Sequence, residues 1–415
     1  MYRSIILTLL TIFSTQMLTA QQSPWAGKSD EELRQIADEL AQKYIITDGH
    51  VDLPYRLEAR NFRLTKEFIG IPIETDDGDF DYVRAKEGGL DAPFMSIYIP
   101  SSYQETGGAK EFADELIDMV NGIAEAHPDK FRVATTAKQV KKNFKKGIIS
   151  LPMGMENGAP IEDDIANVQY FYDRGIRYIT LTHGKDNQIC DSSYDDTGTW
   201  GGLSPFGREV VKEMNRVGIM VDISHVSDDA FYQAVELSEV PCIASHSSLR
   251  HFTPDFVRNM SDDMVKKLAE KGGVIQINFG SGFLDQKIRD YQAEKREELR
   301  MMLAEKGLEY TDDEAEPIIK QFQKDNPNLY SDVEKVADHI DRVVQLVGID
   351  HVGLGSDFDG VGDSLPTGLK DVSQYPNLIF TLMKRGYSKE DIAKVCYKNV
   401  FRVWKEVQKY AKKAK

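Results

Sequence analysis

Cysteine is scarce in this chain, with only Cys190, Cys242 and Cys396 among 415 residues. Three thiols cannot all pair within one chain, and no two of them stand in a CxxC spacing. The sequence therefore argues against a thiolate metal site of the zinc-finger type. Cys242 lies in the apolar run VPCIA, which predicts a buried small side chain.

An excess of positive charge is also missing. The chain has 51 Lys and Arg against 67 Asp and Glu, which gives a formal net charge of −16. Nucleic acids and anionic membrane surfaces are both bound through a basic face, so this balance argues against either as a partner. We interpret the acidic excess as a property that favours solubility.

Long apolar runs are absent after the first twenty residues, MYRSIILTLLTIFSTQMLTA. That segment has a cation at Arg3, an apolar centre and a small residue at Ala20, which predicts a signal peptide over residues 1–20, cleaved before Gln21. A retained anchor is the alternative, but the run is short and interrupted by Thr and Ser. No cysteine follows the cleavage site, and the terminal EVQKYAKKAK offers no lipid-anchor signal. We expect an exported protein, periplasmic or secreted, with no stable membrane anchor.

The composition, 41% hydrophobic and 28% charged, is that of a globular protein, and the length allows one large barrel or two ordinary domains. Apolar runs alternate with amphipathic stretches. The runs are YIIT, FMSIYI, IISLPM, RYITLT, IMVDIS, PCIASH, VIQINF and HVGLGS. Eight repeats of strand and helix predict an α/β fold of the (β/α)₈ TIM-like barrel type over residues 21–415, as a single domain. A doubly wound open sheet is the alternative.

Two predicted helices have residues typical of helix ends at both their start and their finish. Residues 204–218 begin with Ser204 and Pro205 and end at Gly218, and residues 261–273 follow the same plan. We also expect an irregular first connection that contains a hairpin, and a charged helical insertion over residues 281–345, before the eighth strand.

Polar side chains follow most of the predicted strands. In a barrel these carboxyl ends converge on one rim, where the chemistry of this architecture is found. The residues are His50, Asp52, Glu156, His183, His225, His246, Asp357 and Asp359. Of the other histidines, His127 and His339 fall on helical stretches, His351 begins the eighth strand at the opposite rim, and His251 lies in a loop with no clear role. A single histidine at a strand end is usually a hydrogen-bonded loop residue. Four of them beside carboxylates are better explained by a metal site.

The stretch TDGHVDLPY contains the first of these groups. His50 and Asp52 are two positions apart, so in an extended segment both side chains point to the same side. Taken alone, the pair fits either a metal site or a structural hydrogen bond. With the other strand ends, two metal ligands are the simpler interpretation. Imidazoles and carboxylates without thiolates suit zinc in a hydrolytic site.

The chain resembles the renal or membrane dipeptidase family of the amidohydrolase superfamily, peptidase family M19. The resemblance rests on DGHVDLP, GMENG, LTH, GLSPFGREVVKEMNRVGIMVDISHVS, ASHSS, RNMSD and HVGLGSDFDG, which occur in this order across nearly all of the mature chain. It implies a (β/α)₈ barrel with two zinc ions that hydrolyses dipeptides, often with a D-residue at the C-terminal position. Val51 and Gly184 depart from common family residues, which bears on substrate preference.

The resemblance also implies roles for single residues. One zinc would be held by His50, Asp52 and Glu156, and the other by Glu156, His225 and His246. Five residues with one shared carboxylate give each ion three protein ligands and leave a position for water. By the same resemblance His183 contacts the substrate or its tetrahedral intermediate, Arg258 binds the substrate carboxylate, and Asp357 transfers the proton. Without the family, Arg258 would be interpreted as a solvated loop arginine.

This site would support hydrolysis by a hydroxide that bridges the two metals, since coordination lowers the pKa of water to about 7. Asp357 would carry the proton to the leaving amine, and His183 would stabilise the oxyanion. For Asp359 we prefer a structural role in its loop. Two alternatives remain: an amidohydrolase that acts on lactones, phosphoesters or N-acyl amino acids, and a binding or scaffold protein with an inactive metal site. The preferred dipeptide and a homodimer are left open.

Overall fold

The computed structural model describes residues 24–60, 63–64 and 73–414. The predicted signal peptide lies outside these residues. Within them, eight parallel strands form one sheet in which strand order follows sequence order. They are β1 (Ile46–Val51), β4 (Leu90–Tyr98), β7 (Met153–Glu156), β8 (Ile176–Thr180), β9 (Met220–Asp222), β10 (Ile243–Ser247), β11 (Val274–Ile277) and β12 (Val352–Leu354). A doubly wound sheet would reverse its order at a switch point, so the alternative is wrong.

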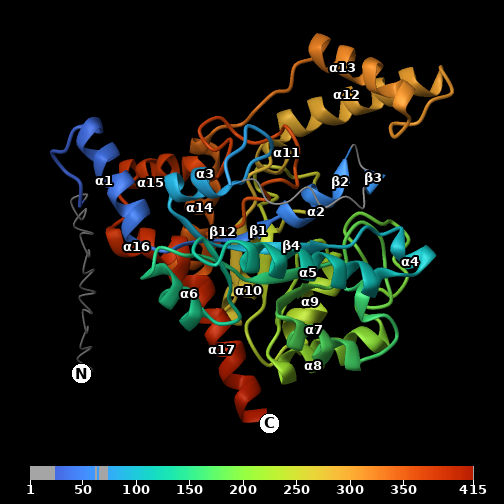
Figure 1. The fold of residues 1–415 in the computed structure, drawn as a ribbon, viewed down its shortest axis with the longest axis horizontal. Coiled ribbons are helices and arrows are strands. Elements are labelled where there is room, and N and C mark those ends of the chain that lie inside the picture. The colour runs from blue at the N-terminus through green and yellow to red at the C-terminus, as the bar shows by residue number, and fades with distance from the viewer. Residues whose placement is uncertain (1–23, 61–62, 65–72, 415) are drawn as a thin grey trace, which may run out of the picture.

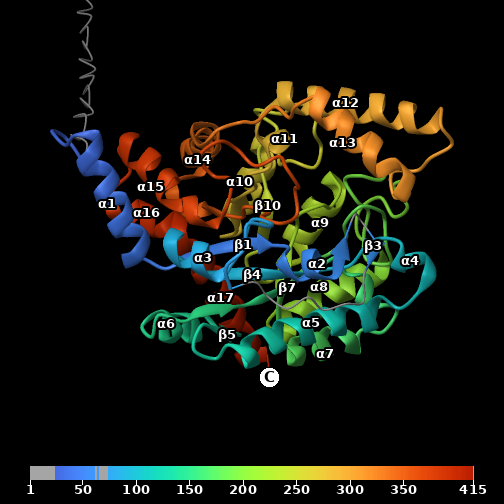
Figure 2. The ribbon, with the colours of Figure 1, turned by 45° about the horizontal axis from the view of Figure 1, so that its top comes forward.

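The first and last strands meet and nearly close the sheet into a barrel. The amide of Asp52 donates to the carbonyl of Phe358 at 2.9 Å, and the amide of Asp357 donates to the carbonyl of His50 at 3.1 Å. Helices surround the strands (Figures 1 and 2). The fold is thus a (β/α)₈ TIM-like barrel, as the alternating pattern predicts.

The helices that follow the strands are amphipathic and bury one face against them. They are α5 (Ala109–Ala126), α7 (Ala166–Arg174), α8 (Pro205–Val217), α9 (Asp228–Leu237), α10 (Asp262–Glu270), α14 (Val333–Val347) and α17 (Asn399–Ala414). The predicted signals are present at α8, where the Ser204 side chain accepts from the amide of Gly207 and Gly218 is left-handed, with φ 100°. Helix α10 is capped by Ser261 but ends at Glu270, earlier than predicted.

The apolar run IISLPM is one predicted strand but two observed ones. Residue Pro152 separates β6 (Ile149–Leu151) from β7, because proline has no amide hydrogen to donate within a sheet. Strand β6 pairs with β5 (Phe131–Val133) outside the barrel, next to α6 (Ala137–Phe144), and only β7 belongs to the barrel.

The predicted hairpin in the first connection is present as β2 (Ala59–Arg60) and β3 (Arg63–Leu64), after α2 (Leu53–Glu58) and before α3 (Tyr82–Gly88). Helices α15 (Tyr375–Lys384) and α16 (Lys389–Ala393) follow β12, and α1 (Asp30–Lys43) packs on α15. No helix in the described residues is long and apolar enough to cross a membrane.

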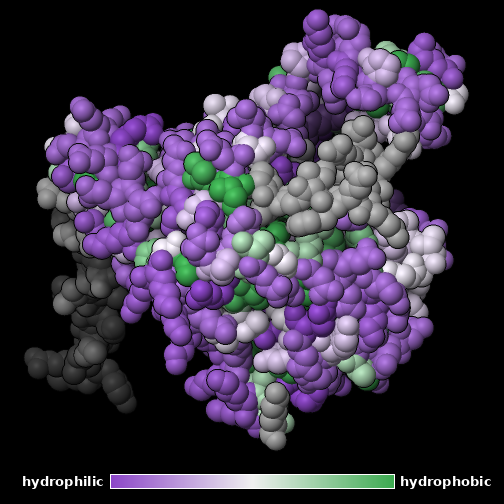
Figure 3. Space-filling model, in the orientation of Figure 1, coloured by the Kyte–Doolittle hydropathy of each residue, from purple (hydrophilic) through white to green (hydrophobic). Residues whose placement is uncertain are grey.

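The predicted insertion over residues 281–345 is too long. Its last part belongs to α14, which packs on β11, β12 and α10 as a regular barrel helix. The true insertion comprises α11 (Ser281–Leu284), α12 (Gln286–Ala304) and α13 (Glu316–Asp325). Helices α12 and α13 extend away from the barrel (Figures 1 and 2), share a small apolar core of their own, and present a mainly hydrophilic surface (Figure 3).

Candidate metal centre

The carboxyl ends of the strands bring seven of the predicted polar residues to one rim. Residues His50, Glu156 and His246 lie within β1, β7 and β10, whereas the others follow β1, β8, β9 and β12 within three residues. The seven residues are His50, Asp52, Glu156, His183, His225, His246 and Asp357. Three overlapping groups of them have ligand atoms within 4.8 Å of one another: His50 with Glu156 and His246, Glu156 with His183 and His225, and His50 with Asp52 and Asp357.

Glu156 lies at the centre of this cluster. Its Oε1 is 3.0 Å from Nε2 of His225 and 3.2 Å from Nε2 of His246. Its Oε2 is 3.3 Å from Nε2 of His50, which is itself 3.3 Å from Oδ2 of Asp52. The two oxygens of one carboxylate therefore face two different sets of ligands. Such a carboxylate can bridge two metal ions.

The backbone at the rim is strained at two of these positions. His225 has φ 67° and Asp357 has φ 65°, both in the left-handed region that side chains other than glycine rarely adopt. Strain of this kind persists only where the surrounding structure fixes it, and it is concentrated at functional sites. The barrel thus directs these two side chains toward the cluster at a cost in local conformation.

Hydrogen bonds fix the proton on the far nitrogen of two histidines. The hydroxyl of Tyr178 donates to the carbonyl of Gly49 at 3.0 Å, so it accepts from Nδ1 of His50 at 2.8 Å. In the same way Ser245 Oγ donates to Asp222 Oδ2 at 2.6 Å and accepts from Nδ1 of His246 at 2.8 Å. In the neutral form of each ring this arrangement leaves Nε2 without a proton and facing the cluster, as metal ligation requires.

Buried polar atoms of the cluster that lack hydrogen-bond partners also fit a metal centre. Nε2 of His50 and Oδ1 of Asp52 are buried and have no hydrogen-bond partner in the described part of the chain. Nε2 of His225 and Nε2 of His246 are only 2.9 Å apart. Buried polar atoms without partners are costly, and bound cations would satisfy them.

The charges of the cluster are consistent with this interpretation. Burial lowers the pKa of His183, and holds the pKa values of His225 and His246 well below the usual range. Burial alone would raise the pKa of Glu156, but His50 and His183 outweigh it and the pKa lies well below its usual range. Burial would lower the pKa of His50, but Tyr178, Asp52 and Glu156 outweigh it and hold that pKa well above its usual range. Imidazoles grouped around one carboxylate are a donor set that zinc binds.

Asp357 is buried beside the cluster, and the pKa of its carboxyl is raised. Burial, with Asp52 and Glu156, raises its pKa to about 8, although His50 opposes the shift. Its Oδ2 accepts from Nδ2 of Asn278 at 2.7 Å. Asn278 follows β11 and was not singled out from the sequence, although it is the polar residue at the end of the run VIQINF.

Arg258 is not a solvated loop residue, because it is only 3% exposed. Its Nη1 donates to Ser247 Oγ at 2.6 Å and its Nη2 donates to the carbonyl of His246 at 2.8 Å. Its Nε is buried without a partner in the described residues. The guanidinium is thus tied to β10, while its Nε–H remains available to a bound group.

Of the remaining predicted residues, His183 lies at the cluster, whereas Asp359 and His251 lie outside the metal-ligand groups. His183 is 23% exposed, lies 3.6 Å from Glu156 Oε1, and its ring packs on those of Tyr98 and His225. Asp359 Oδ1 accepts from the amide of Asp79 at 2.7 Å and lies 3.1 Å from Arg56 Nε, which fits a structural role in its loop. His251 is exposed, and its ring contacts Phe252 rather than any of the metal-ligand groups.

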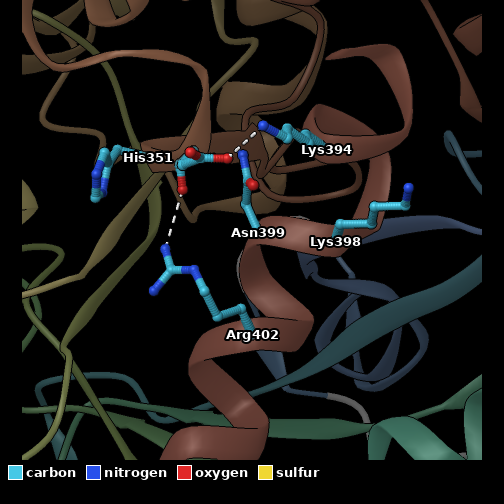
Figure 4. Close-up of a pocket in the computed structure, with 6 residues that line it drawn as sticks. His351, Lys394, Lys398, Asn399 and Arg402 are labelled. Atoms are coloured by element: carbon cyan, nitrogen blue, oxygen red, sulfur yellow. Dashed lines mark hydrogen bonds and ion pairs between the residues drawn. The ribbon is translucent and has the colours of Figure 1, made fainter. Parts of the chain in front are cut away.

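A pocket of about 410 Å³ lies at the opposite rim of the barrel, before β12 (Figure 4). It is lined by several cations, but they have partners. Lys394 pairs with Asp350 at 2.8 Å, Lys398 pairs with Glu390 at 2.6 Å, and Arg402 donates to the carbonyls of Gly272 and Asp350. Catalytic sites of barrels occur at the carboxyl ends of the strands, so this pocket is a weaker candidate.

Comparisons with known proteins agree with this geometry. A family model described as membrane dipeptidase (peptidase family M19) matches residues 34–415. Dipeptidase tcpJ of Claviceps purpurea is 32% identical over 372 residues, which cover 88% of this chain and 77% of that protein.

Two solved structures share the fold over most of their length. The probable dipeptidase PvdM from Pseudomonas aeruginosa has a TM-score of 0.77 and 26% identity, and the match covers 92% of this chain and 100% of that one. A metallo peptidase from Rhodobacter sphaeroides, liganded with a phosphinate mimic of the dipeptide L-Ala-D-Ala, has a TM-score of 0.70 and 25% identity over 88% and 99%. This chain therefore belongs to the membrane dipeptidase family, peptidase family M19, and is a metal-dependent dipeptidase with an amidohydrolase-type fold.

Proposed function

We propose that the chain binds two zinc ions and hydrolyses free dipeptides, including those with a C-terminal D-residue. The observation that carries this proposal is the position of Glu156, whose two oxygens face separate histidine sets. His50, Asp52 and Glu156 would hold one ion, and Glu156, His225 and His246 the other. When bound, the ions supply water activation near neutral pH and polarise the scissile carbonyl.

The surrounding side chains would bind and protonate the substrate. The free Nε of Arg258 is available to the terminal carboxylate of a dipeptide, which would favour free dipeptides over longer peptides. Asp357, with its raised pKa, can accept a proton and return it to the leaving amine. The partly exposed His183 would donate to the developing oxyanion.

The inclusion of dipeptides with a C-terminal D-residue is supported by one comparison. The Rhodobacter sphaeroides metallo peptidase, which shares the fold at 25% identity, is liganded with a mimic of L-Ala-D-Ala. We extend this to the present chain as part of the proposal.

The decisive experiment combines metal analysis with a dipeptide panel. Protein stripped by a chelator and reloaded with zinc should hold close to two equivalents, and hydrolysis of L-Ala-L-Ala and L-Ala-D-Ala should appear only after reloading. Glu156→Gln should lose zinc and activity together, whereas Glu162→Gln, an exposed residue shortly after the same strand, is the matched control. Full activity with one equivalent would overturn the two-metal site.

We also propose that the protein is exported after cleavage behind Ala20. The support is the charged, apolar and small-residue order of the first twenty residues. Amino-terminal sequencing of the protein recovered from its native cells should begin at Gln21.

A further inference from the structure

Arg289 is an arginine beside the site that has no ion-pair partner among the described residues. It lies on the first turns of α12, and its guanidinium carbon is 3.4 Å from the ring centre of Phe256. In the described residues its side chain has no ion pair, in contrast to Arg300 on the same helix, which pairs with Glu297 at 2.6 Å. Its guanidinium is half-buried, and its close described partner is an aromatic ring rather than a carboxylate.

The aromatic residues around Arg289 connect it to Arg258. Phe256 and Phe283 have ring centres 5.2 Å apart, and Arg258 lies 5.6 Å from the centre of the Phe283 ring. Phe256 is on the same loop as Arg258, two positions earlier. The two arginines therefore flank the ring pair of Phe256 and Phe283, which we call the aromatic wall.

The same wall reaches the metal centre through Tyr194. Its ring centre is 6.1 Å from that of Phe256 and 5.7 Å from that of His225. Tyr194 is 47% exposed whereas Phe256 is buried, so this row of rings reaches solvent at Tyr194. A substrate at the metal centre with its carboxylate on Arg258 would thus have Arg289 close to the side chain of its C-terminal residue.

We propose that Arg289 forms a second anion subsite, which selects dipeptides whose C-terminal residue is aspartate or glutamate. The inference rests on the proposed function, because it assigns the main-chain carboxylate to Arg258. Arginine suits this task because its planar, always charged group can stack on an aromatic ring and still donate to a carboxylate. The alternative is that Arg289 only fastens α12 to the barrel through Phe256.

The test compares substrates that differ only in charge. For the zinc-loaded protein, kcat/KM is measured on L-Ala-D-Glu and L-Ala-D-Gln, and on the corresponding L,L pair. The native chain should prefer the acid over the amide by about tenfold or more, as one charge-assisted contact provides. Arg289→Gln should remove most of this preference, Arg289→Lys should restore part of it, and Arg300→Gln on the same helix should keep it.

The outcomes separate the two proposals. Equal kcat/KM values for acid and amide in the native chain, or an unchanged preference in Arg289→Gln, would overturn the subsite and leave the dipeptidase intact. A lower melting temperature in Arg289→Gln, with the acid preference retained, would assign Arg289 to fastening α12. Hydrolysis of none of the four dipeptides would overturn the subsite, and hydrolysis of L-Ala-L-Ala and L-Ala-D-Ala would then decide separately whether the dipeptidase proposal stands.

Discussion

The phenol of Tyr178 holds His50 in one tautomer, since its oxygen lies 2.8 Å from Nδ1 of His50 and itself donates to the carbonyl of Gly49. The tyrosine comes from β8 and the histidine from β1, so the contact crosses the interior of the barrel. Partners of this kind orient a ligand and raise its basicity.

Removing this hydroxyl should weaken metal binding. For Tyr178→Phe we expect zinc affinity to fall by roughly 10- to 100-fold, as for other such partners, because His50 loses its orienting acceptor. Competition with a chromophoric chelator would measure the change, with Tyr232→Phe on the exposed face of α9 as the control. An unchanged affinity would show that the backbone of β1 is sufficient to orient His50.

The Asp357→Asn variant should keep both metals and lose most of its turnover. Asparagine can still accept from Asn278, so the loop should be retained, but it cannot take up a proton. Loss of a general acid–base group costs roughly 100- to 10,000-fold in rate. Steady-state kinetics with metal analysis on the same sample would measure both effects, and near-native kcat would show that another group moves the proton.

Arg258→Ala should reduce discrimination for a free carboxylate. We expect the native protein to prefer a dipeptide over its C-terminal amide, and the variant to lose about 1.5–3 kcal/mol of this preference with the charge-assisted contact. Since Arg258 also supports β10 through Ser247 and the carbonyl of His246, Ser247→Ala is the control for that support. Equal discrimination in the native protein and Arg258→Ala would move the role to another residue.

Acid should destabilise the fold through His339, which lies away from the metal centre. Burial lowers its pKa to about 3, and its nitrogens are engaged by the amide of Leu249 and the carbonyl of Leu284. Because the folded pKa lies below the usual value of about 6.5, the stabilisation is complete above pH 6.5 and is lost as the pH falls toward 3.

The size of this effect is about 1.4 kcal/mol per pH unit within that window, for one proton. Urea unfolding at pH 7 and pH 5 should show a steeper loss of stability in the native protein than in His339→Gln. The exposed His251→Gln is the control for removing an imidazole. Parallel pH dependence in the native protein and His339→Gln would contradict the assignment.

Prediction from the sequence is most accurate for features that depend only on residues close together in the chain. The spacing of His50 and Asp52 places both on one side of a strand, and a polar residue after an apolar run marks the carboxyl end of a barrel strand. The same rules gave the eight strands and the rim position of the cluster. They do not depend on which distant segments meet.

Features that depend on distant contacts were missed. Nothing near Tyr178 in the sequence indicates that its hydroxyl meets His50, and the burial of Arg258 follows from its contacts with β10. The break at Pro152 was visible as a residue, but whether a proline ends a strand or lies at its edge depends on the neighbouring strands. Similarly, α14 could be separated from the insertion only by its packing on the barrel.

The seam between β1 and β12 gives the cluster a mechanical role. The two backbone hydrogen bonds that join these strands involve His50, Asp52 and Asp357, so the barrel closes beside the predicted metal site. Cations bound there would hold the first and the last strand of the barrel, β1 and β12, together. Loading zinc should therefore slow hydrogen exchange at the amides of Asp52 and Asp357 more than at the opposite rim, and stripping it should release the seam first.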